Sequence, residues 1–340
     1  MDSVTLNNNH KDYKSIKILT DLKARVSTEW KKRTVLAPVG GNRRNLIIDI
    51  LDALKMLHMS KNYDVVIVTS SRRAHIFSLL SALRKKKKIP ILMIDCLWYK
   101  PKNVIKYYFK KIQLRIESIA INKFIVWASH EVNDYSEIFN IPKDKFLFVP
   151  FHHSLEGFKY VIEDNGYIFS GGDGDRDYVT LIKAVKDLSK PVKIATRLKN
   201  WNKGISIPEN IEAFPTSQSD FRKWMAGASI VVVPMEAGHL HSGGQQTYLN
   251  AMAMGKPLIV ADTKGALDYI DNGVNGVIVQ SGDYHALNTV LKKLINEPEL
   301  AKSMSDNGEM IYEKYSTHKC MENILDIAEQ LVVSDQIQRI

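Results

Sequence analysis

An alternation of short apolar segments with amphipathic segments of helical spacing is the feature of this sequence that most constrains its fold. In the first half, the apolar segments lie at residues 34–38, 63–70, 89–95, 123–129 and 145–150. Strands that are apolar throughout are buried on both faces, as in a parallel sheet that is covered by helices. We therefore predict a parallel α/β sheet for this half, preceded by a helix over residues 14–32.

The same alternation starts again after residue 160. Further apolar segments lie at residues 166–172, 190–197, 210–215, 229–235, 256–262 and 275–283. Two such arrays in series predict an α/β chain with two Rossmann-like doubly wound domains that face a central cleft. We predict an N-terminal domain at 1–155 and a C-terminal domain at 156–316. A last helix at 317–340 is expected to pack back on the N-terminal domain.

The most informative local motif is SGGQQTYLNAMAMGKP, at residues 242–257. It follows a predicted strand, and its two glycines lead directly into a predicted helix. Glycine lets the backbone approach an anion closely, and the first N–H groups of a helix carry the positive end of its dipole. The motif therefore predicts a site for a diphosphate. The residues expected to form this site are Ser242, Gly243, Gly244, Gln245, Gln246 and Thr247.

Residues 166–316 resemble, almost continuously, the C-terminal domain of family-4-type glycosyltransferases (glycosyl transferases group 1) of the GT-B fold. NAMAMGKPLIVAD, DYIDNGVNGVIVQSGD and LKKLINEPELAKSMSDNGEMIYEKYS occur in the order expected for that family. The resemblance implies that this domain binds a nucleotide sugar and that the N-terminal domain binds the acceptor. It implies a hexosyltransferase-like, metal-independent transfer of a sugar from a nucleotide diphosphate donor, with UDP or GDP as the nucleotide, to an acceptor hydroxyl. Synthesis of a cell-surface polysaccharide, lipopolysaccharide or glycolipid is the expected context.

The segment FSGGDGDRDYVTLIKAV (169–185) resembles the upstream donor motif of the family. The family has Gly-Arg at the end of this strand and a lysine shortly afterwards, and both hold the diphosphate. Here Gly171-Gly172 replaces Gly-Arg, and Arg176 occupies the lysine-like position. A guanidinium can bridge two phosphate oxygens, although an ion pair with a neighbouring aspartate is the alternative. The further residues predicted for the donor site are Gly172, Arg176, Arg197 at the end of the next strand, and Phe214, where the family cradles the nucleobase.

Two positions depart from the family pattern. The family usually has two glutamates separated by seven residues, and this chain has Ser242 and Asn250 at those positions. Asn250 can still hydrogen-bond a ribose hydroxyl, but it accepts less strongly than a carboxylate. Glu236 lies in the preceding loop and is a candidate catalytic or sugar-binding group, with a solvated surface glutamate as the alternative. The retaining mechanism that the resemblance implies is weakened by these substitutions.

The N-terminal half offers fewer candidates. Gly41, after the strand at 34–38, resembles a glycine turn that lets the donor sugar approach. Asp95 ends a predicted strand at the cleft edge, where a carboxylate could take the proton of an acceptor hydroxyl as a general base. A helix cap or loop hydrogen bond is the equally weighted alternative for Asp95. His130 and the pair His152-His153 face the cleft by topology.

The charge of the chain indicates its partners. Lysine and arginine number 47 against 37 acidic residues, a net charge of +10, and the excess lies mainly in the first 160 residues. Residues 99–115 interleave lysines with Tyr107, Tyr108 and Phe109, a pattern typical of a basic amphipathic helix at a membrane interface. We hypothesise peripheral contact with an anionic membrane and a glycan or lipid-linked acceptor, with a merely solvated basic surface as the equally weighted alternative. No recognised nucleic-acid-binding module occurs, so no nucleic acid partner is expected.

Other classes of site are not expected. The two cysteines, Cys96 and Cys320, have no spacing typical of a disulfide framework or a zinc site. No histidine has a partner at metal-ligand spacing, so we expect no metal and no cofactor besides the donor substrate. No apolar run is long enough to span a bilayer, and the N-terminus does not resemble a signal peptide. We expect a cytoplasmic protein, with peripheral binding to the inner face of the membrane as the membrane hypothesis.

Two other functions remain open from the sequence. A nucleotide-sugar 2-epimerase uses the same two-domain fold, although it needs acidic and histidine groups around the sugar. A catalytically degenerate subunit could bind the nucleotide or a partner enzyme without turnover, and Asn250 is the feature that favours it. The sequence does not indicate the donor sugar, the acceptor or the anomer formed.

Overall fold

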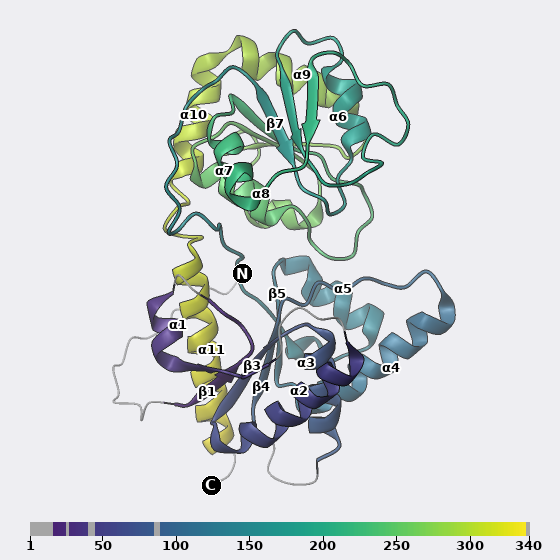
Figure 1. The fold of residues 1–340 in the computed structure, drawn as a ribbon, viewed down its shortest axis with the longest axis vertical. Coiled ribbons are helices and arrows are strands. Elements are labelled where there is room, and N and C mark those ends of the chain that lie inside the picture. Colours follow the sequence, from purple (N-terminus) through teal and green to yellow (C-terminus); the bar gives the residue numbers. More distant parts are fainter. Residues whose placement is uncertain (1–15, 25–26, 40–44, 85–88, 338–340) are drawn as a thin grey trace.

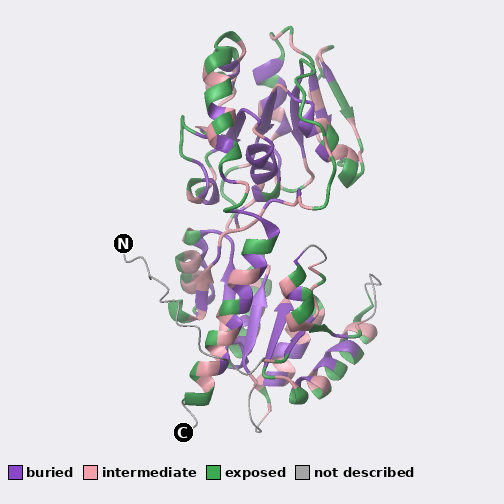
Figure 2. Cartoon of the chain, turned by 90° about the vertical axis from the view of Figure 1, so that its left-hand side faces the viewer, coloured by how far each residue is buried: buried purple, intermediate pink, exposed green. Residues whose placement is uncertain are grey.

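The chain forms two α/β domains that are stacked end to end in the computed structural model (Figure 1). The structure describes residues 16–24, 27–39, 45–84 and 89–337. Each domain is built on a six-stranded sheet in which all neighbouring strands are parallel. Figure 2 shows most strands of both sheets as buried, exposed residues on edge strands, and the outer faces of several helices as exposed. This is the two-domain parallel α/β fold that the repeated alternation predicts.

The N-terminal sheet has the strand order β2-β1-β3-β4-β5-β6. Its strands are β1 (Ile18–Thr20), β2 (Thr34–Leu36), β3 (Val65–Thr69), β4 (Ile91–Ile94), β5 (Lys123–Val126) and β6 (Phe146–Phe148). Helices cover both faces and enclose two separate apolar cores. One face carries α2 (Leu46–Met59), α3 (Arg72–Ala82), α4 (Val104–Ala120) and α5 (Ser129–Phe139), with the short 3₁₀ helices η1 (Ser60–Asn62) and η2 (Lys143–Lys145) in the connections. The other face carries α1 (Thr28–Arg33) and the last helix, α11 (Thr317–Ile337).

The C-terminal sheet has the strand order β12-β11-β10-β7-β8-β9, so the order reverses between β7 and β10. Its strands are β7 (Ile168–Gly171), β8 (Val192–Ala195), β9 (Ile211–Phe214), β10 (Ile230–Val233), β11 (Leu258–Ala261) and β12 (Val277–Val279). The helices are α6 (Tyr178–Val185), α7 (Gln218–Ala226), α8 (Gln245–Ala253), α9 (Tyr284–Asn296) and α10 (Pro298–Glu309), with the 3₁₀ helix η3 (Lys264–Asp268). Cores on both faces of the sheet account for the wholly apolar sequences of β10 and β11, whereas β8 and the edge strand β9 also contain Lys193 and Glu212.

The prediction of a helix over residues 14–32 is wrong. Ile18 and Leu19 lie in β1, fully buried between β2 and β3, and the helix α1 begins only at Thr28. Ile18 and Leu19 are buried in the cores on the two faces of the sheet, Ile18 beside α11 and Leu19 beside α2 and α3. The strand before Gly41 is therefore β2, at the edge of the described sheet, and Gly41 itself lies outside the described residues.

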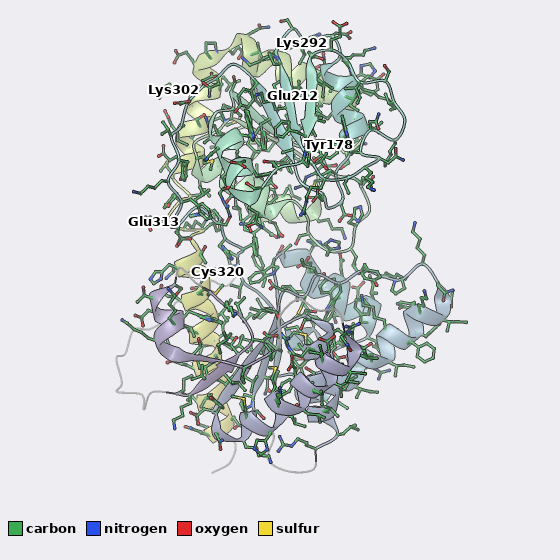
Figure 3. The ribbon with its side chains drawn as sticks, viewed as in Figure 1. Tyr178, Glu212, Lys292, Lys302, Glu313 and Cys320 are labelled. Carbon is green, nitrogen blue, oxygen red and sulfur yellow. The ribbon has the colours of Figure 1, made fainter. Side chains whose placement is uncertain are left out.

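The chain crosses between the domains twice, and the two crossings are hydrogen-bonded to each other. The backbone N–H of His153 donates to the carbonyl of Tyr315 at 2.8 Å, and Oγ1 of Thr317 donates to the carbonyl of His153 at 3.0 Å. After the second crossing, α11 runs along the N-terminal domain, with Glu313 above the crossing and Cys320 below it (Figure 3). Ile324 and Leu325 of α11 are fully buried against the N-terminal sheet. The N-terminal domain is thus completed by the last helix of the chain.

Candidate active site

A cavity opens at the carboxyl ends of β7, β8 and β9 and the start of α8, beside the point where the strand order of the C-terminal sheet reverses. Doubly wound sheets bind their ligands at this position. The cavity has a volume of about 400 Å³ and is lined by Gly172, Arg197, Thr247 and Asn250 among others. We refer to it as the C-terminal cavity. Five residues that the sequence predicted for the donor site, these four and Gln246, therefore line one cavity.

The first turn of α8 forms part of this wall. Gly244, the residue before the helix, has φ +81°, and a Cβ there would lie 3.1 Å from both Met235 Sδ and Val233 Cγ1, so the position requires glycine. The N–H groups of a first helical turn have no carbonyl partner in a preceding turn. Gln246 and Thr247 line the cavity. The N–H of Thr247 already donates to the carbonyl of Gly244 at 2.9 Å, so an anion in the cavity would meet the N–H of Gln246 and the positive end of the helix dipole.

The beginning of the glycine motif contacts the N-terminal domain instead of the cavity. The backbone N–H and Oγ of Ser242 donate to Glu131 Oε1 at 2.7 and 2.9 Å. Nε2 of Gln245 donates to the carbonyl of Trp127 at 2.9 Å. Ser242, Gly243 and Gln245 are not part of the cavity wall. Direct contact of these three residues with a diphosphate, which the motif predicts, is not favoured by this geometry.

Glu131 is a residue of this site that sequence reasoning missed. It lies in the first turn of α5 and is fully buried. Its Oε2 accepts from the N–H groups of Trp127 and Ala128 at 3.0 and 3.1 Å, while Oε1 accepts from Ser242. Burial raises the pKa of this carboxyl, and the hydrogen bonds from Ser242 oppose that rise. A glutamate just inside a helix start is a capping signal, but no local pattern indicates its partner 111 residues away.

Arg176 lies behind the cavity wall. Its Nε donates to the carbonyl of Gly171 at 2.9 Å, Nη1 to that of Gly174 at 2.8 Å, and Nη2 to Thr247 Oγ1 at 3.0 Å. The side chain is buried and is not among the residues that line the cavity. The alternative of a surface ion pair does not describe it either. The geometry favours a supporting role, in which Arg176 fixes the turn after β7 to α8.

Arg197 and Phe214 differ in their relation to the cavity. Arg197 lines it, and its guanidinium pairs with Asp173 at 2.5 Å. Phe214 packs against Trp224 with its ring, outside the cavity wall. The neighbouring Thr216 lines the cavity in its place. The predicted segment Phe214-Pro215-Thr216-Ser217 thus lines the cavity through Thr216 and Ser217 and not through Phe214.

Asn250 connects the cavity to the crossing between the domains. Its Oδ1 accepts from the N–H of Ser154 at 2.8 Å, and Asn250 is almost fully buried. Both residues line the C-terminal cavity. A ribose hydroxyl would meet an amide that is already held in place by the crossing.

Glu236 lies outside the wall of the C-terminal cavity. Its carboxylate pairs with Lys203 at 2.6 Å, and His239 lies 3.7 Å from its other oxygen. The hydrogen bond from Lys203 is the largest cause of its lowered pKa. Glu236 lines neither the C-terminal cavity nor the cavity beside Asp95. The alternative of a solvated loop glutamate describes it better than a catalytic role.

A second cavity, of about 290 Å³, lies beside Asp95 on the N-terminal side of the cleft. We refer to it as the cleft cavity. Asp95 has φ +57°, and its Oδ1 accepts a hydrogen bond from Trp127 Nε1 at 3.1 Å. Burial raises the pKa of Asp95. Ser154 and Arg222 line both cavities, so the two cavities adjoin.

Arg222, on α7, is the second residue that sequence reasoning missed. It follows the segment that was expected to cradle the nucleobase, but helix spacing alone did not place it at the cleft. His152 lines the cleft cavity, and burial lowers its pKa. Among the residues that the structure describes, no group of three or more histidine, cysteine, aspartate or glutamate side chains is arranged to hold a metal ion.

Replacing Arg176 by lysine tests its supporting role. We expect Arg176→Lys to lower the free energy of unfolding by about 3 kcal/mol, because lysine cannot reproduce the planar set of donors and leaves buried acceptors unpaired. Urea unfolding followed by tryptophan fluorescence measures this change. Arg197→Lys is the matched control, since its side chain is 75% exposed and its ion pair should contribute less than about 1 kcal/mol. Equal losses in the two variants would contradict the supporting role.

Comparison with known proteins identifies the C-terminal domain. The family described as Glycosyl transferases group 1 matches residues 175–310. An uncharacterised glycosyltransferase of Methanocaldococcus jannaschii is 26% identical over 157 residues, 44% of each chain. The capsular polysaccharide biosynthesis glycosyltransferase CapM of Staphylococcus aureus is 32% identical over 77 residues, 22% of this chain and 20% of CapM. The matched stretches thus span less than half the length of these relatives.

The fold of the whole chain is similar to that of solved glycosyltransferase-fold structures. The structure of Anabaena HepE in complex with UDP superposes with a TM-score of 0.70 at 11% sequence identity, over 93% of this chain and all of HepE. At this level of identity the likeness concerns the fold. The chain therefore carries a glycosyl transferases group 1 domain, at residues 175–310, within the two-domain GT-B fold of glycosyltransferases.

Proposed function

We propose that this chain transfers a sugar from a nucleotide diphosphate donor to the hydroxyl of a glycan or lipid-linked acceptor. The observation that carries the proposal is the continuity of the two cavities. The C-terminal cavity contains the start of α8, and it adjoins the cleft cavity, which contains Asp95. A donor bound in the first cavity would direct its sugar into the second.

The donor proposal rests on the first turn of α8 and on one comparison. The N–H of Gln246 and the positive end of the α8 dipole suit a diphosphate, and HepE, which shares the fold, was solved with UDP. UDP is therefore the first nucleotide to test, followed by GDP. The relative CapM takes part in capsular polysaccharide biosynthesis, which supports a cell-surface polysaccharide as the context of the acceptor.

The proposed chemistry requires few groups. Hydrogen-bond donors at the start of α8 would stabilise the diphosphate as it leaves with the bonding electrons of the sugar. Asp95 would accept the proton of the attacking hydroxyl. The contacts between the domains around Ser242 and Glu131 would keep water from the reacting sugar.

Binding and turnover of the donor test the proposed function. We expect UDP or GDP to raise the melting temperature, because a ligand at a hundredfold its dissociation constant adds about 2.7 kcal/mol of stability. Transfer is then measured with a radiolabelled donor, with and without a glycan acceptor. Formation of a C2 epimer from the donor alone would favour the epimerase. Binding without any turnover would favour the degenerate subunit, and no binding of either nucleotide would contradict the proposal.

The pH dependence of transfer tests Asp95. A general base must be ionised, so activity should fall as the pH decreases through the pKa of Asp95. Burial raises that pKa, which places the acid limb above the ordinary aspartate value of about 3.9. Asp95→Asn should remove the limb and lower kcat by about 10²–10⁴-fold, with UDP affinity retained. Glu156→Gln, at another carboxylate of the cleft cavity, should keep the limb, and an acid limb that persists in Asp95→Asn would contradict the assignment.

We also propose that the chain binds the surface of an anionic membrane through α2 and α4. On α4 the outward face carries an apolar stripe at helical spacing, with Ile105 67% and Phe109 71% exposed. A second stripe lies on α2, where Ile47 is 67% exposed. The exposed apolar residues of the two helices are Leu46, Ile47, Ile50, Leu51 and Leu54 on α2, and Val104, Ile105, Tyr108, Phe109, Ile112, Ile116 and Ile119 on α4.

The two stripes belong to one surface, because α2 and α4 both pack against α3. A groove of about 950 Å³ lies among these helices, with apolar Leu79 and Phe109 and the cations Arg72 and Lys106 on its wall. No described helix combines the length and the apolar content needed to cross a membrane. Apolar stripes that face outward thus require an occupant that is not part of the described chain.

The positive charge of this surface favours an anionic bilayer as its partner. Residues 97–116 contain six lysines and arginines and no acidic residue. A second copy of the chain would meet this surface with the same sign of charge. Anionic lipid satisfies the lysines and accepts the apolar stripes at once. The proposal places the chain at the inner face of the membrane, beside a lipid-linked acceptor.

Vesicle flotation tests this surface. The protein should bind vesicles containing phosphatidylglycerol, more weakly at high salt and in pure phosphatidylcholine. Replacing Ile105, Phe109 and Ile112 together by serine should lower binding at least tenfold, since each buried apolar side chain contributes about 1.5–3 kcal/mol. The matched control replaces three exposed apolar residues of the C-terminal domain, Leu267, Val274 and Met310. Equal binding of the two triple variants would contradict the proposal.

A further inference from the structure

Arg222 is the cation of the C-terminal cavity that lacks an anionic partner. Three charged side chains line this cavity, and two of them, Asp173 and Arg197, pair with each other. Among the described residues, Arg222 forms no ion pair. Its Nη2 donates to Ser154 Oγ at 2.9 Å and its Nη1 donates to the carbonyl of Gln218 at 3.1 Å. Both of these acceptors are neutral.

The guanidinium of Arg222 is also incompletely hydrogen-bonded. Only 9% of the residue is exposed, and its Nε has no partner among the described residues. Burial lowers the pKa of Arg222, as expected of a cation that lacks a nearby anion. A buried donor without a partner calls for an explanation, and a buried charge is normally paired. The guanidinium of Arg222 thus has an unpaired N–H donor and a positive charge that could bind an anion.

The position of Arg222 indicates which anion this is. Arg222 and Ser154 are the two residues that line both the C-terminal cavity and the cleft cavity. A donor that extends from the first cavity toward Asp95 must pass this boundary. In a nucleotide sugar, the diphosphate is the anionic part that joins the nucleoside to the sugar.

Neither of the two arginines predicted from the sequence is free for this task. Arg176 is occupied by Gly171, Gly174 and Thr247 behind the wall. Arg197 is paired with Asp173. Among the residues predicted from the sequence, none is therefore a cation that is free to bind the diphosphate.

We propose, on the basis of the proposed function, that Arg222 binds the diphosphate of the donor and stabilises it as the leaving group. In the transfer step, the bond between the sugar C1 and the diphosphate oxygen breaks, and that oxygen keeps the electron pair. The acceptor oxygen bonds to C1, and its proton passes to Asp95. Arg222 faces the negative charge that develops on the diphosphate. It thereby takes the role that the sequence suggested for Arg176.

A purely structural role is the competing explanation. The guanidinium carbon of Arg222 lies 3.8 Å from the centre of the Phe158 ring, and Ser154 belongs to the same crossing between the domains. Arg222 could thus serve only to attach the crossing to α7. Phe158→Leu removes the ring contact and keeps the arginine, so it measures the effect of loosening that attachment.

Calorimetric titration with UDP, UMP and uridine separates these roles. In Arg222→Gln we expect at least tenfold weaker binding of UDP, with uridine binding changed less than twofold. Arg222→Lys keeps the charge and should fall between Gln and wild type. In turnover, Arg222→Gln should lower kcat, and added guanidinium ion at millimolar concentration should restore part of it. Phe158→Leu should leave the ratio of UDP to uridine affinity unchanged.

The outcomes distinguish this inference from the proposed function. Failure of the wild-type chain to bind UDP, or GDP with the matching guanosine series, would overturn the proposed function itself. Wild-type binding with unchanged UDP affinity in Arg222→Gln would overturn only the role of Arg222. Equal weakening of UDP and uridine, reproduced by Phe158→Leu, would assign Arg222 to the structural role.

Discussion

The hydrogen bonds between Glu131 and Ser242 set the geometry on which the rest of the site depends. They join the first turn of α5 in one domain to the glycine loop before α8 in the other. Because a buried carboxylate is costly without donors, Glu131 holds this loop firmly in one position. Asp95 takes no part in this contact itself. Trp127 links Asp95 to Glu131, since its backbone N–H donates to Glu131 and its Nε1–H donates to Asp95.

This contact also gives a physical reason for the serine at position 242. The resembling family usually has glutamate here, and a second carboxylate would face Glu131 at a buried site. Space is limited as well, since even a Cβ on Gly265 would lie 2.6 Å from the Cβ of Ser242. Ser242 and Glu131 thus belong to one arrangement, in which the buried carboxylate at this contact comes from the N-terminal domain.

The sequence pattern predicted those features of the structure that depend on interactions within a few residues of the chain. Apolar strands such as β3 and β10 and the glycine turn before α8 follow from burial and from backbone freedom within a few residues. β1 was missed because three residues carry too little periodicity to outweigh the helical spacing around them. Glu131 and Arg222 were missed for another reason. Their partners lie on other elements, 111 and 68 residues away, and no spacing within a helix reveals such contacts.

The placement of α11 has a consequence for the order in which the chain folds during synthesis. The core beneath β1 contains Ile18, from the start of the chain, together with Ile324 and Leu325. One face of the N-terminal sheet is therefore covered only by α1 on the ribosome until α11 has emerged. The C-terminal domain, continuous in sequence between the crossings, can close first. The domain made first is thus the domain finished last, and its apolar sheet face is the surface that a chaperone would have to shield.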